Sequence, residues 1–189
     1  ISDPRQLIAV AMLRKGDKFD SYTMLAGALD RIRDRDWKLT VIGDGPMRTE
    51  IKSLFSTFGE DRITWRGERS TSQIASELAT AGLYVWPGCN EAYGLAYLEA
   101  QAAGLPVVAQ ATAGVPEVVM ADKTGLLTPE GDIEAYAHAV AQLLTDPERR
   151  LAMANAAHDF VHRERSLTAA SKRLETILRN HLGDSYYER

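Results

Sequence analysis

The segment "LYVWPGCNEAYGLAYLEAQAAGLPVVAQ", Leu83–Gln110, decides the fold. It begins with a short apolar run, passes through a loop that contains glycine, and ends with a second apolar run, Pro106–Gln110. Between them we expect a helix from about Gly94 to Ala103, because a glycine at position 104 with a proline soon after it is typical of a helix end. An order of strand, loop, helix and strand is typical of an α/β protein with a parallel sheet.

The same alternation runs along much of the chain. Apolar runs are followed by segments whose apolar residues recur every three or four positions, as Tyr22, Leu25 and Leu29 do. The expected strands are Leu7–Met12, Lys38–Gly43, Ile63–Gly67, Leu83–Pro87, Pro106–Gln110 and Gly125–Pro129, and further expected helices are Ser21–Asp34, Met47–Phe58 and Ser72–Ala81. This pattern predicts a doubly wound, mainly parallel Rossmann-like α/β sheet of about six strands, with helices on both faces.

After Pro129 the pattern becomes wholly helical. Asp132 and Asp146 are expected N-caps, the second followed by a proline at the first helical position, and Ser166 is expected to cap the last helix. The final residues, "GDSYYER", are expected to fray. The sequence thus predicts one domain over residues 1–189 with a helical C-terminal tail.

Composition excludes several classes of protein. The 189 residues are 45% hydrophobic and 25% charged, with a net charge of −4 and no basic block, which argues against a nucleic-acid partner. The apolar runs are too short to span a bilayer, and nothing indicates membrane association. A single cysteine, Cys89, favours a reducing compartment, and we expect a cytoplasmic protein. Because the chain begins with Ile1 at a strand lead-in, we expect a piece of something longer.

Ligands of an open parallel sheet bind beyond the carboxyl ends of its strands, so the loops there should carry the chemistry. No Gly-Lys pair exists for a P-loop, and "GDGP", which begins at Gly43, has only half of a dinucleotide fingerprint. An ordinary strand-to-helix turn is the favoured interpretation of "GDGP". The start of the helix at Gly94 and Leu95 is more promising, because free N–H groups and the helix dipole there favour an anion.

Two glutamates flank that helix start. Apolar residues lie on nearly every side of the expected helix, so we expect it to be buried and Glu99 to pair with a cation or to hold the hydroxyls of a ligand. Glu91 precedes the helix by a short loop. Eight residues of helix span roughly 12 Å, whereas carboxylates that cleave glycosides lie about 5–9.5 Å apart. This spacing favours two carboxylates that grip different parts of one elongated ligand. Two structural roles, a helix cap for Glu91 and a buried ion pair for Glu99, stay open.

The segment Glu91–Val108 resembles the E-x7-E signature of retaining glycosyltransferases of family GT4, the "glycosyl transferases group 1" class. Further segments follow in the order that this family shows: "VIGDGPMR", "ITWRG", "AGVPEVV" and "TGLLTPEGD". The resemblance implies a GT-B architecture of two Rossmann-like domains, of which this chain is similar to the C-terminal, donor-binding one. The N-terminal, acceptor-binding domain would be absent.

By this resemblance, Glu91 contacts hydroxyls of the donor sugar, Glu99 holds the ribose, and the backbone N–H groups of Gly94 and Leu95 hold the diphosphate. Arg66 and Gly67 lie beside the base, and we count Tyr93 and Gly43 among the expected donor-binding residues. The family also places a lysine and an arginine at the leaving diphosphate. Lys18 matches the lysine, but Met12 stands where the arginine is expected, so Arg14 either replaces it or the site lacks one cation.

The implied reaction is transfer of a hexose from a UDP-, GDP- or ADP-linked sugar to an unknown acceptor, with retention of configuration and without a metal or other cofactor. His158 and His162 are interpreted as a surface pair rather than metal ligands, and Cys89 as a small filler rather than a nucleophile. Two alternatives are a non-catalytic nucleotide-sugar-binding module and a GT-B epimerase-like enzyme. The resemblance implies that this chain alone binds a nucleoside diphosphate weakly and is inactive.

Overall fold

The computed structural model describes residues 3–59 and 61–182. The last predicted segment, residues 183–189, lies outside the described residues. The strands are β1 (Gln6–Val10), β2 (Lys38–Ile42), β3 (Ile63–Gly67), β4 (Leu83–Val85), β5 (Val107–Gln110) and β6 (Gly125–Thr128). The α-helices are α1 (Asp17–Arg31), α2 (Arg48–Leu54), α3 (Thr71–Leu78), α4 (Leu95–Ala102), α5 (Val115–Val118), α6 (Ile133–Thr145), α7 (Pro147–Phe160) and α8 (Leu167–Leu182).

The strands form one sheet in the order β3-β2-β1-β4-β5-β6, and every neighbouring pair is parallel. This is the order of a doubly wound sheet, in which the chain first builds outward from β1 and then crosses to build outward on the other side. The predicted fold class is confirmed. The reversal of direction lies between β1 and β4, which places the loops after these two strands side by side.

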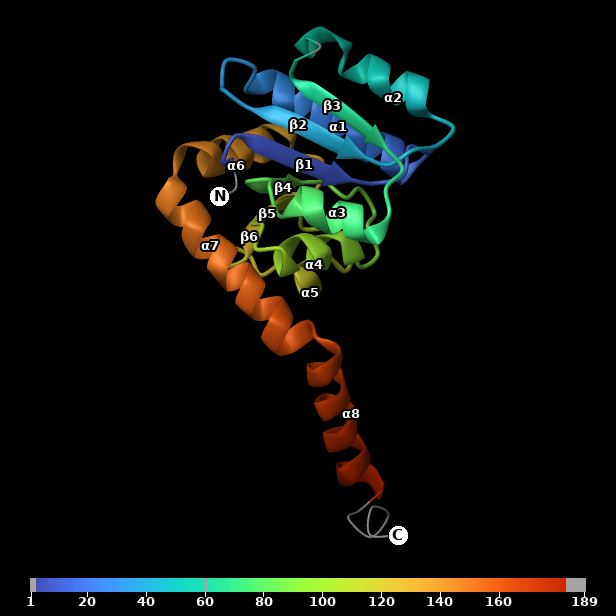
Figure 1. The fold of residues 1–189 in the computed structure, drawn as a ribbon, viewed down its shortest axis with the longest axis vertical. Coiled ribbons are helices and arrows are strands. Elements are labelled where there is room, and N and C mark those ends of the chain that lie inside the picture. Colours follow the sequence, from blue (N-terminus) through green and yellow to red (C-terminus); the bar gives the residue numbers. More distant parts are fainter. Residues whose placement is uncertain (1–2, 60, 183–189) are drawn as a thin grey trace.

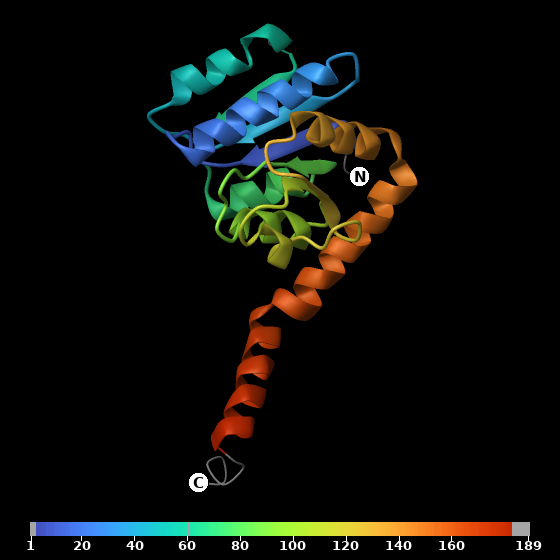
Figure 2. The same ribbon diagram turned by 180° about the vertical axis from the view of Figure 1, so that it is seen from behind.

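Helices cover both faces of the sheet. Figure 1 shows α3, α4 and α5 on one face, and Figure 2 shows α1, α2 and α6 on the other. Strands β4 and β5 are therefore buried throughout, whereas the edge strand β3 alternates: Ile63 is buried and Thr64 and Arg66 are exposed. The core consists of strand residues and of the inward stripes of the helices, such as Tyr22, Leu25 and Leu29 of α1, as predicted.

Helix boundaries follow local capping. Asp132 accepts a hydrogen bond from the Ala135 N–H at 2.8 Å, Asp146 from that of Arg149 at 2.9 Å, and Ser166 from that of Ala169 at 3.2 Å, so all three predicted N-caps are confirmed. The predicted start of the first helix at Ser21 is wrong. Helix α1 begins at Asp17, four residues earlier, because a polar first turn carries Asp17 and Asp20 where the helix dipole favours acidic side chains.

The predicted helix Met47–Phe58 divides. Helix α2 ends at Leu54, and a 3-10 turn follows over Ser56–Phe58. Beyond α7 a π-helical segment, Val161–Arg165, leads into α8, which extends away from the body of the domain (Figure 1). Its apolar side chains Leu167, Leu174 and Ile177 are 88%, 56% and 48% exposed. None of the described helices is long and apolar enough to cross a membrane.

Candidate active site

The reversal point of the sheet brings together two segments that lie far apart in the sequence. One follows β1 and leads into α1, and the other follows β4 and leads into α4. Hydrogen bonds join them: the Cys89 N–H donates to Ser21 Oγ at 2.9 Å, and Asn90 Nδ2 donates to Asp17 Oδ1 at 3.0 Å. Because ligands of this class of sheet bind beyond the carboxyl ends of its strands at the reversal point, this edge is the candidate active site.

Lys18 and Glu91 meet at the junction of the two segments. The ammonium donates to Glu91 Oε2, and both side chains keep only about a fifth of their surface exposed, 20% and 21%. The same ammonium lies over the ring of Trp86, 5.5 Å from the ring centre. The face of this ring, which directly follows β4, also favours the positive charge of Lys18. The lysine expected at the leaving diphosphate and the glutamate expected at the donor sugar are therefore in direct contact, and each is the counter-charge of the other.

Tyr97 fixes the shape of the loop that carries Glu91. Its buried hydroxyl donates to the Trp86 carbonyl at 3.1 Å, and its ring leaves room only for glycine at two positions. A Cβ at Gly94 (φ 81°) would lie 2.3 Å from Tyr97 Cδ2, and one at Gly88 (φ 69°) would lie 2.0 Å from the Tyr97 hydroxyl. This positioning role of Tyr97 was not predicted from the sequence, where an aromatic residue three positions after a glycine was the available signal.

The start of α4 is open. Leu95 is 67% exposed and Tyr93 is 43% exposed, and the N–H groups of Leu95 and Ala96 have no hydrogen-bond partner among the residues that the structure describes. Glycine at position 94 adopts the left-handed conformation that turns the chain into the helix. Unpaired N–H groups at the positive end of a helix can bind an anion.

The exposure of Glu99 differs from what the sequence predicted. The helix was expected to be buried on nearly every side, but α4 buries only Tyr97, Ala100 and Gln101, and Glu99 is exposed. The reason is that α3 and α4 leave a cavity of about 430 Å³ between them, lined by Glu99 together with Ile74 and Ala102, among others. No hydrogen bond or ion pair joins the Glu99 carboxylate to another described residue, so the expected buried ion pair is absent and the carboxylate is available to a ligand.

The remaining predicted residues lie after β1 and β2 and in the last two positions of β3, Arg66 and Gly67. The Gly43 N–H donates to the Gly67 carbonyl at 2.9 Å, and a Cβ at Gly43 would lie 2.0 Å from the Ala11 carbonyl oxygen, so backbones cross closely there. Arg66 pairs with Glu77 of α3 at 3.0 Å. Arg14 is exposed and has no partner among the described residues, and Met12 is 58% exposed.

A second cavity, of about 490 Å³, lies beyond the ends of β1 and β2. We call it the β1–β2 cavity. Its apolar wall is formed by Val10, Met12, Ile42 and Ile74, and charged residues of the loops after β2 and β3 complete it. Because Ile74 lines both this cavity and the one that contains Glu99, the two cavities adjoin.

Within residues 3–59 and 61–182, no three His, Cys, Asp or Glu side chains gather where they could hold a metal ion. His158 and His162 stack with ring centres 4.0 Å apart, well away from the candidate site in the sequence. Two aspartates separated by one residue, Asp34 and Asp36, could also be considered as metal ligands. They precede β2 and so lie at the amino ends of the strands, opposite the candidate site, and Asp36 pairs with Arg5 at 3.0 Å. Cys89 is half-buried, and its Sγ accepts a hydrogen bond from the side-chain amide Nε2 of Gln110 at 3.4 Å.

The family model described as "Glycosyl transferases group 1" matches residues 2–160. The chain belongs to the glycosyl transferases group 1 family. A relative in this family is the GDP-mannose-dependent alpha-(1-6)-phosphatidylinositol monomannoside mannosyltransferase of Mycobacterium tuberculosis, which is 32% identical over 166 residues, covering 82% of this chain and 43% of that protein.

Solved structures confirm the fold of this group 1 domain. The sucrose-phosphate synthase of Thermosynechococcus elongatus matches with a TM-score of 0.82 and 25% identity, over 94% of this chain and 45% of that one. HepE of Anabaena, solved in complex with UDP-glucose, matches with a TM-score of 0.73 and 20% identity, over 90% of this chain and 48% of that one. The group 1 chain thus spans less than half the length of these relatives.

Proposed function

We propose that this chain is the donor-binding half of a retaining glycosyltransferase that transfers a hexose from a nucleotide-diphosphate sugar. The observation that carries the proposal is the arrangement around the start of α4. A free carboxylate at Glu99, unpaired N–H groups at Leu95 and Ala96, and the carboxylate of Glu91 follow one another along a single segment. Hydroxyls, an anion and more hydroxyls are the ligand groups that such a series would bind.

Each part of the donor then has a partner in the site. Glu99 accepts hydrogen bonds from the ribose hydroxyls, the start of α4 binds the diphosphate, and Glu91 accepts from hydroxyls of the hexose. Lys18 lies beside Glu91 and supplies positive charge to the leaving diphosphate, with Arg14 as a second cation. In this role the cations and the helix start stabilise the charge that develops as the sugar leaves.

The acceptor belongs to a second domain in this proposal. The chain covers 43% of the mycobacterial mannosyltransferase and 48% of HepE, so each of these proteins has a further half that the chain does not match. We propose that residues 1–189 form a single donor-binding domain and that the acceptor binds to an N-terminal domain across a cleft. This chain alone would then bind donor without transferring it.

The donor nucleotide has two leading candidates. The name of the mycobacterial relative specifies GDP-mannose, and the HepE structure contains UDP-glucose. A diphosphate and a ribose are common to both ligands, and these are the parts that the start of α4 and Glu99 would bind. ADP-linked sugars share the same parts and complete the set to be tested.

One observation favours a second candidate function, a non-catalytic nucleotide-sugar-binding module. Met12 stands where the family pattern has an arginine, which removes one cation from the expected leaving-group site. An epimerase-like enzyme has less support, because the spacing of Glu91 and Glu99 is that of the transferases. The transferase proposal is favoured, since Lys18 and Arg14 still provide two positive charges near the end of β1.

Calorimetric titration of the 189-residue chain with UDP, GDP and ADP tests the proposal. We expect at least one of the three to bind. Glu99→Ala should weaken that binding about tenfold, equivalent to about 1.4 kcal/mol, because the carboxylate has no structural partner to lose. Glu148→Ala, a matched change of an exposed glutamate in α7, should leave binding unchanged.

Removing the ribose hydroxyls provides the decisive comparison. If Glu99 holds the ribose, a 2′,3′-dideoxynucleoside diphosphate should bind the parent chain and Glu99→Ala equally weakly. Failure of all three diphosphates to bind the folded chain would contradict the donor-site assignment. Equal binding of the ribonucleotides to the parent and Glu99→Ala would contradict the ribose role alone.

A further inference from the structure

One of the carboxylates that line the β1–β2 cavity, that of Glu68, is exposed and has no partner among the described residues. Asp44, Glu68 and Arg69 are the charged residues that line the cavity. Asp44 is engaged: the Gly45 N–H donates to its Oδ1 at 2.8 Å, and Arg48 Nη1 donates to its Oδ2 at 2.6 Å. Glu68 makes no hydrogen bond or ion pair with any of the residues described, so its two oxygens are free to accept.

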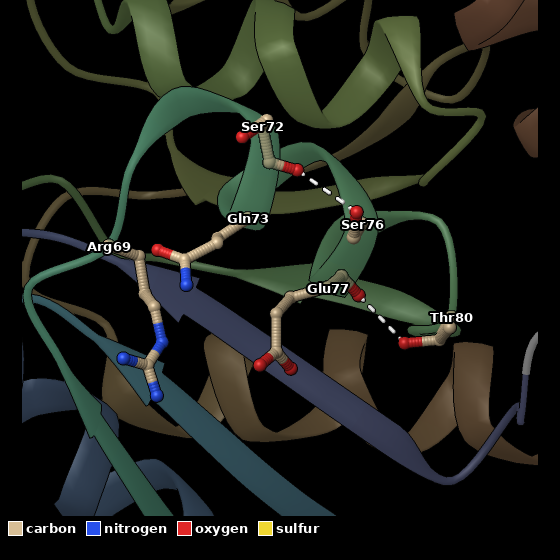
Figure 3. Close-up of a pocket in the computed structure, with 6 residues that line it drawn as sticks. All are labelled: Arg69, Ser72, Gln73, Ser76, Glu77 and Thr80. Atoms are coloured by element: carbon tan, nitrogen blue, oxygen red, sulfur yellow. Dashed lines mark hydrogen bonds between the residues drawn. The ribbon is translucent and has the colours of Figure 1, made fainter.

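The neighbouring cation does not neutralise this carboxylate. Arg69 also lines a third cavity, which lies beside α3, and Figure 3 shows its side chain extending there alongside Gln73 and Glu77. No ion pair joins Arg69 to Glu68 or to another described residue. Of the two acidic residues that line the β1–β2 cavity, Asp44 is paired and Glu68 has no partner among the described residues.

The position of the cavity relates it to the proposed ribose site. Ile74 lines both the β1–β2 cavity and the cavity that contains Glu99. A nucleotide whose ribose lies at Glu99 has its base attached directly to that ribose, so the base would enter the adjoining cavity. Its flat faces would pack on Val10, Ile42 and Ile74, and its polar edge would reach the rim.

We propose, building on the function proposed above, that Glu68 selects guanine and that the donor of this chain is a GDP-sugar. A carboxylate accepts two parallel hydrogen bonds from adjacent N–H donors. Among the candidate bases, guanine alone presents such a pair, the N1–H and the N2 amino group. Uracil presents one N–H between two carbonyl oxygens, which a carboxylate repels, and adenine presents an amino group beside an acceptor nitrogen. Glu68 is exposed in this structure, and a bound base would cover its carboxylate. A base that covers the carboxylate without donating to it leaves it unsatisfied and therefore binds less tightly.

Base analogues test this with the unmodified chain. Titration with GDP, IDP, XDP, UDP and ADP should give the tightest binding for GDP, at least tenfold tighter than for UDP and ADP. IDP, which lacks the N2 amino group, should fall between them. XDP, which has a carbonyl at C2, should bind poorly because that oxygen faces the carboxylate.

Glu68→Gln should invert part of this order. The amide donates to the C2 carbonyl of xanthine, so XDP should bind at least tenfold tighter to the variant than to the parent, while GDP binds about tenfold more weakly. Glu148→Gln is the matched control and should change neither. Because Glu68 is exposed and unpaired, the variant should keep the unfolding temperature of the parent.

The outcomes separate the two proposals. Binding of UDP or ADP as tight as that of GDP, with Glu99→Ala still weakening it, would overturn the guanine assignment and leave the donor site in place. An unchanged order of bases in Glu68→Gln would also overturn it. If no diphosphate binds to the folded chain, the proposed function fails and this inference fails with it.

Discussion

The ion pair between Lys18 and Glu91 joins the start of α1 to the loop after β4, two segments that are separated by 73 residues. In the proposed function these groups serve different parts of the donor, the diphosphate and the hexose. In this structure each neutralises the other, and both are mostly buried. Donor binding therefore has to replace this contact with contacts to the ligand. Glu91 competes with the diphosphate for Lys18, and Lys18 competes with the hexose hydroxyls for Glu91.

This competition predicts an asymmetric effect of Glu91→Ala. Freeing Lys18 should strengthen binding of a nucleoside diphosphate a few-fold, because a partly buried pair of this kind is worth about 1 kcal/mol. Binding of the corresponding nucleotide sugar should gain nothing, since its contact with Glu91 is lost. Calorimetry with both ligands measures the difference, with Glu148→Ala as the control. A loss of diphosphate affinity in Glu91→Ala would contradict the competition.

A second prediction concerns the missing arginine. Met12 is exposed beyond the end of β1, so Met12→Arg can place a guanidinium there without disturbing the core. It should strengthen diphosphate binding about fivefold, equivalent to about 1 kcal/mol for an exposed charge contact. Binding of the monophosphate should change much less. Calorimetry with both nucleotides gives the ratio.

Arg14 provides the complementary test. If it substitutes for the arginine, Arg14→Met should weaken diphosphate binding by a similar factor, whereas Lys15→Met, the same charge change at the next position, should have little effect. Equal losses in the two variants would show that the general charge of the loop matters and that Arg14 has no specific contact.

The sequence predicted the fold well for local reasons. Asp132, Asp146 and Ser166 begin helices because a side-chain oxygen beside free N–H groups acts within a few residues. The order of strands in the sheet is not local. The contact of Lys18 with Glu91 depends on β1 lying next to β4, and no pattern in either segment specifies that pairing.

Glu99 illustrates a different limit. The residues around it are mostly small and apolar, and the pattern indicated a buried helix. Alanine has little side chain to bury, so the exposure of α4 depends on how closely α3 approaches it, and here a cavity separates them. The ligand role of Glu99 is easier to maintain in the exposed position, because a free carboxylate needs no rearrangement to accept from a hydroxyl.

A third prediction tests the fit of Tyr97 against the loop. Gly88 and Gly131 have similar positive φ values, 69° and 73°, but a Cβ at Gly131 would meet no atom within 4 Å. Gly131→Ala should cost about 1 kcal/mol from backbone strain, and Gly88→Ala about 3 kcal/mol, because overlap with the Tyr97 hydroxyl is added. Urea denaturation measures both.

The double variant identifies the overlapping atom. Without the hydroxyl, the nearest atom of the Tyr97 ring to a Cβ at Gly88 is 3.3 Å away. In a Tyr97→Phe background, Gly88→Ala should therefore cost clearly less than in the parent, although Glu91 Cβ at 3.2 Å keeps the site tighter than that of Gly131. The same cost in both backgrounds would mean that the hydroxyl does not determine the need for glycine at position 88.

The last prediction follows from four buried tyrosines, Tyr22, Tyr84, Tyr97 and Tyr136. Burial raises the pKa of each hydroxyl above its ordinary value, because the phenolate would lose its hydration. In the unfolded chain tyrosine has a pKa of about 10. The stability that the neutral hydroxyls contribute is therefore complete below pH 10 and is lost as the pH rises through the folded pKa values. Between pH 10 and 12 each buried tyrosine should lower the free energy of unfolding by about 1.4 kcal/mol per pH unit.

Tyr136, whose hydroxyl donates to the Val108 carbonyl at 2.9 Å, offers the test. Tyr136→Phe should cost about 1 kcal/mol at pH 7 but should reduce the alkaline slope by the contribution of one proton. Urea denaturation at intervals from pH 8 to 11.5 measures the slopes, and Tyr93→Phe is the control because that ring is already exposed in the fold. If parent and Tyr136→Phe lose stability equally steeply above pH 10, burial of the Tyr136 hydroxyl does not contribute to the alkaline transition.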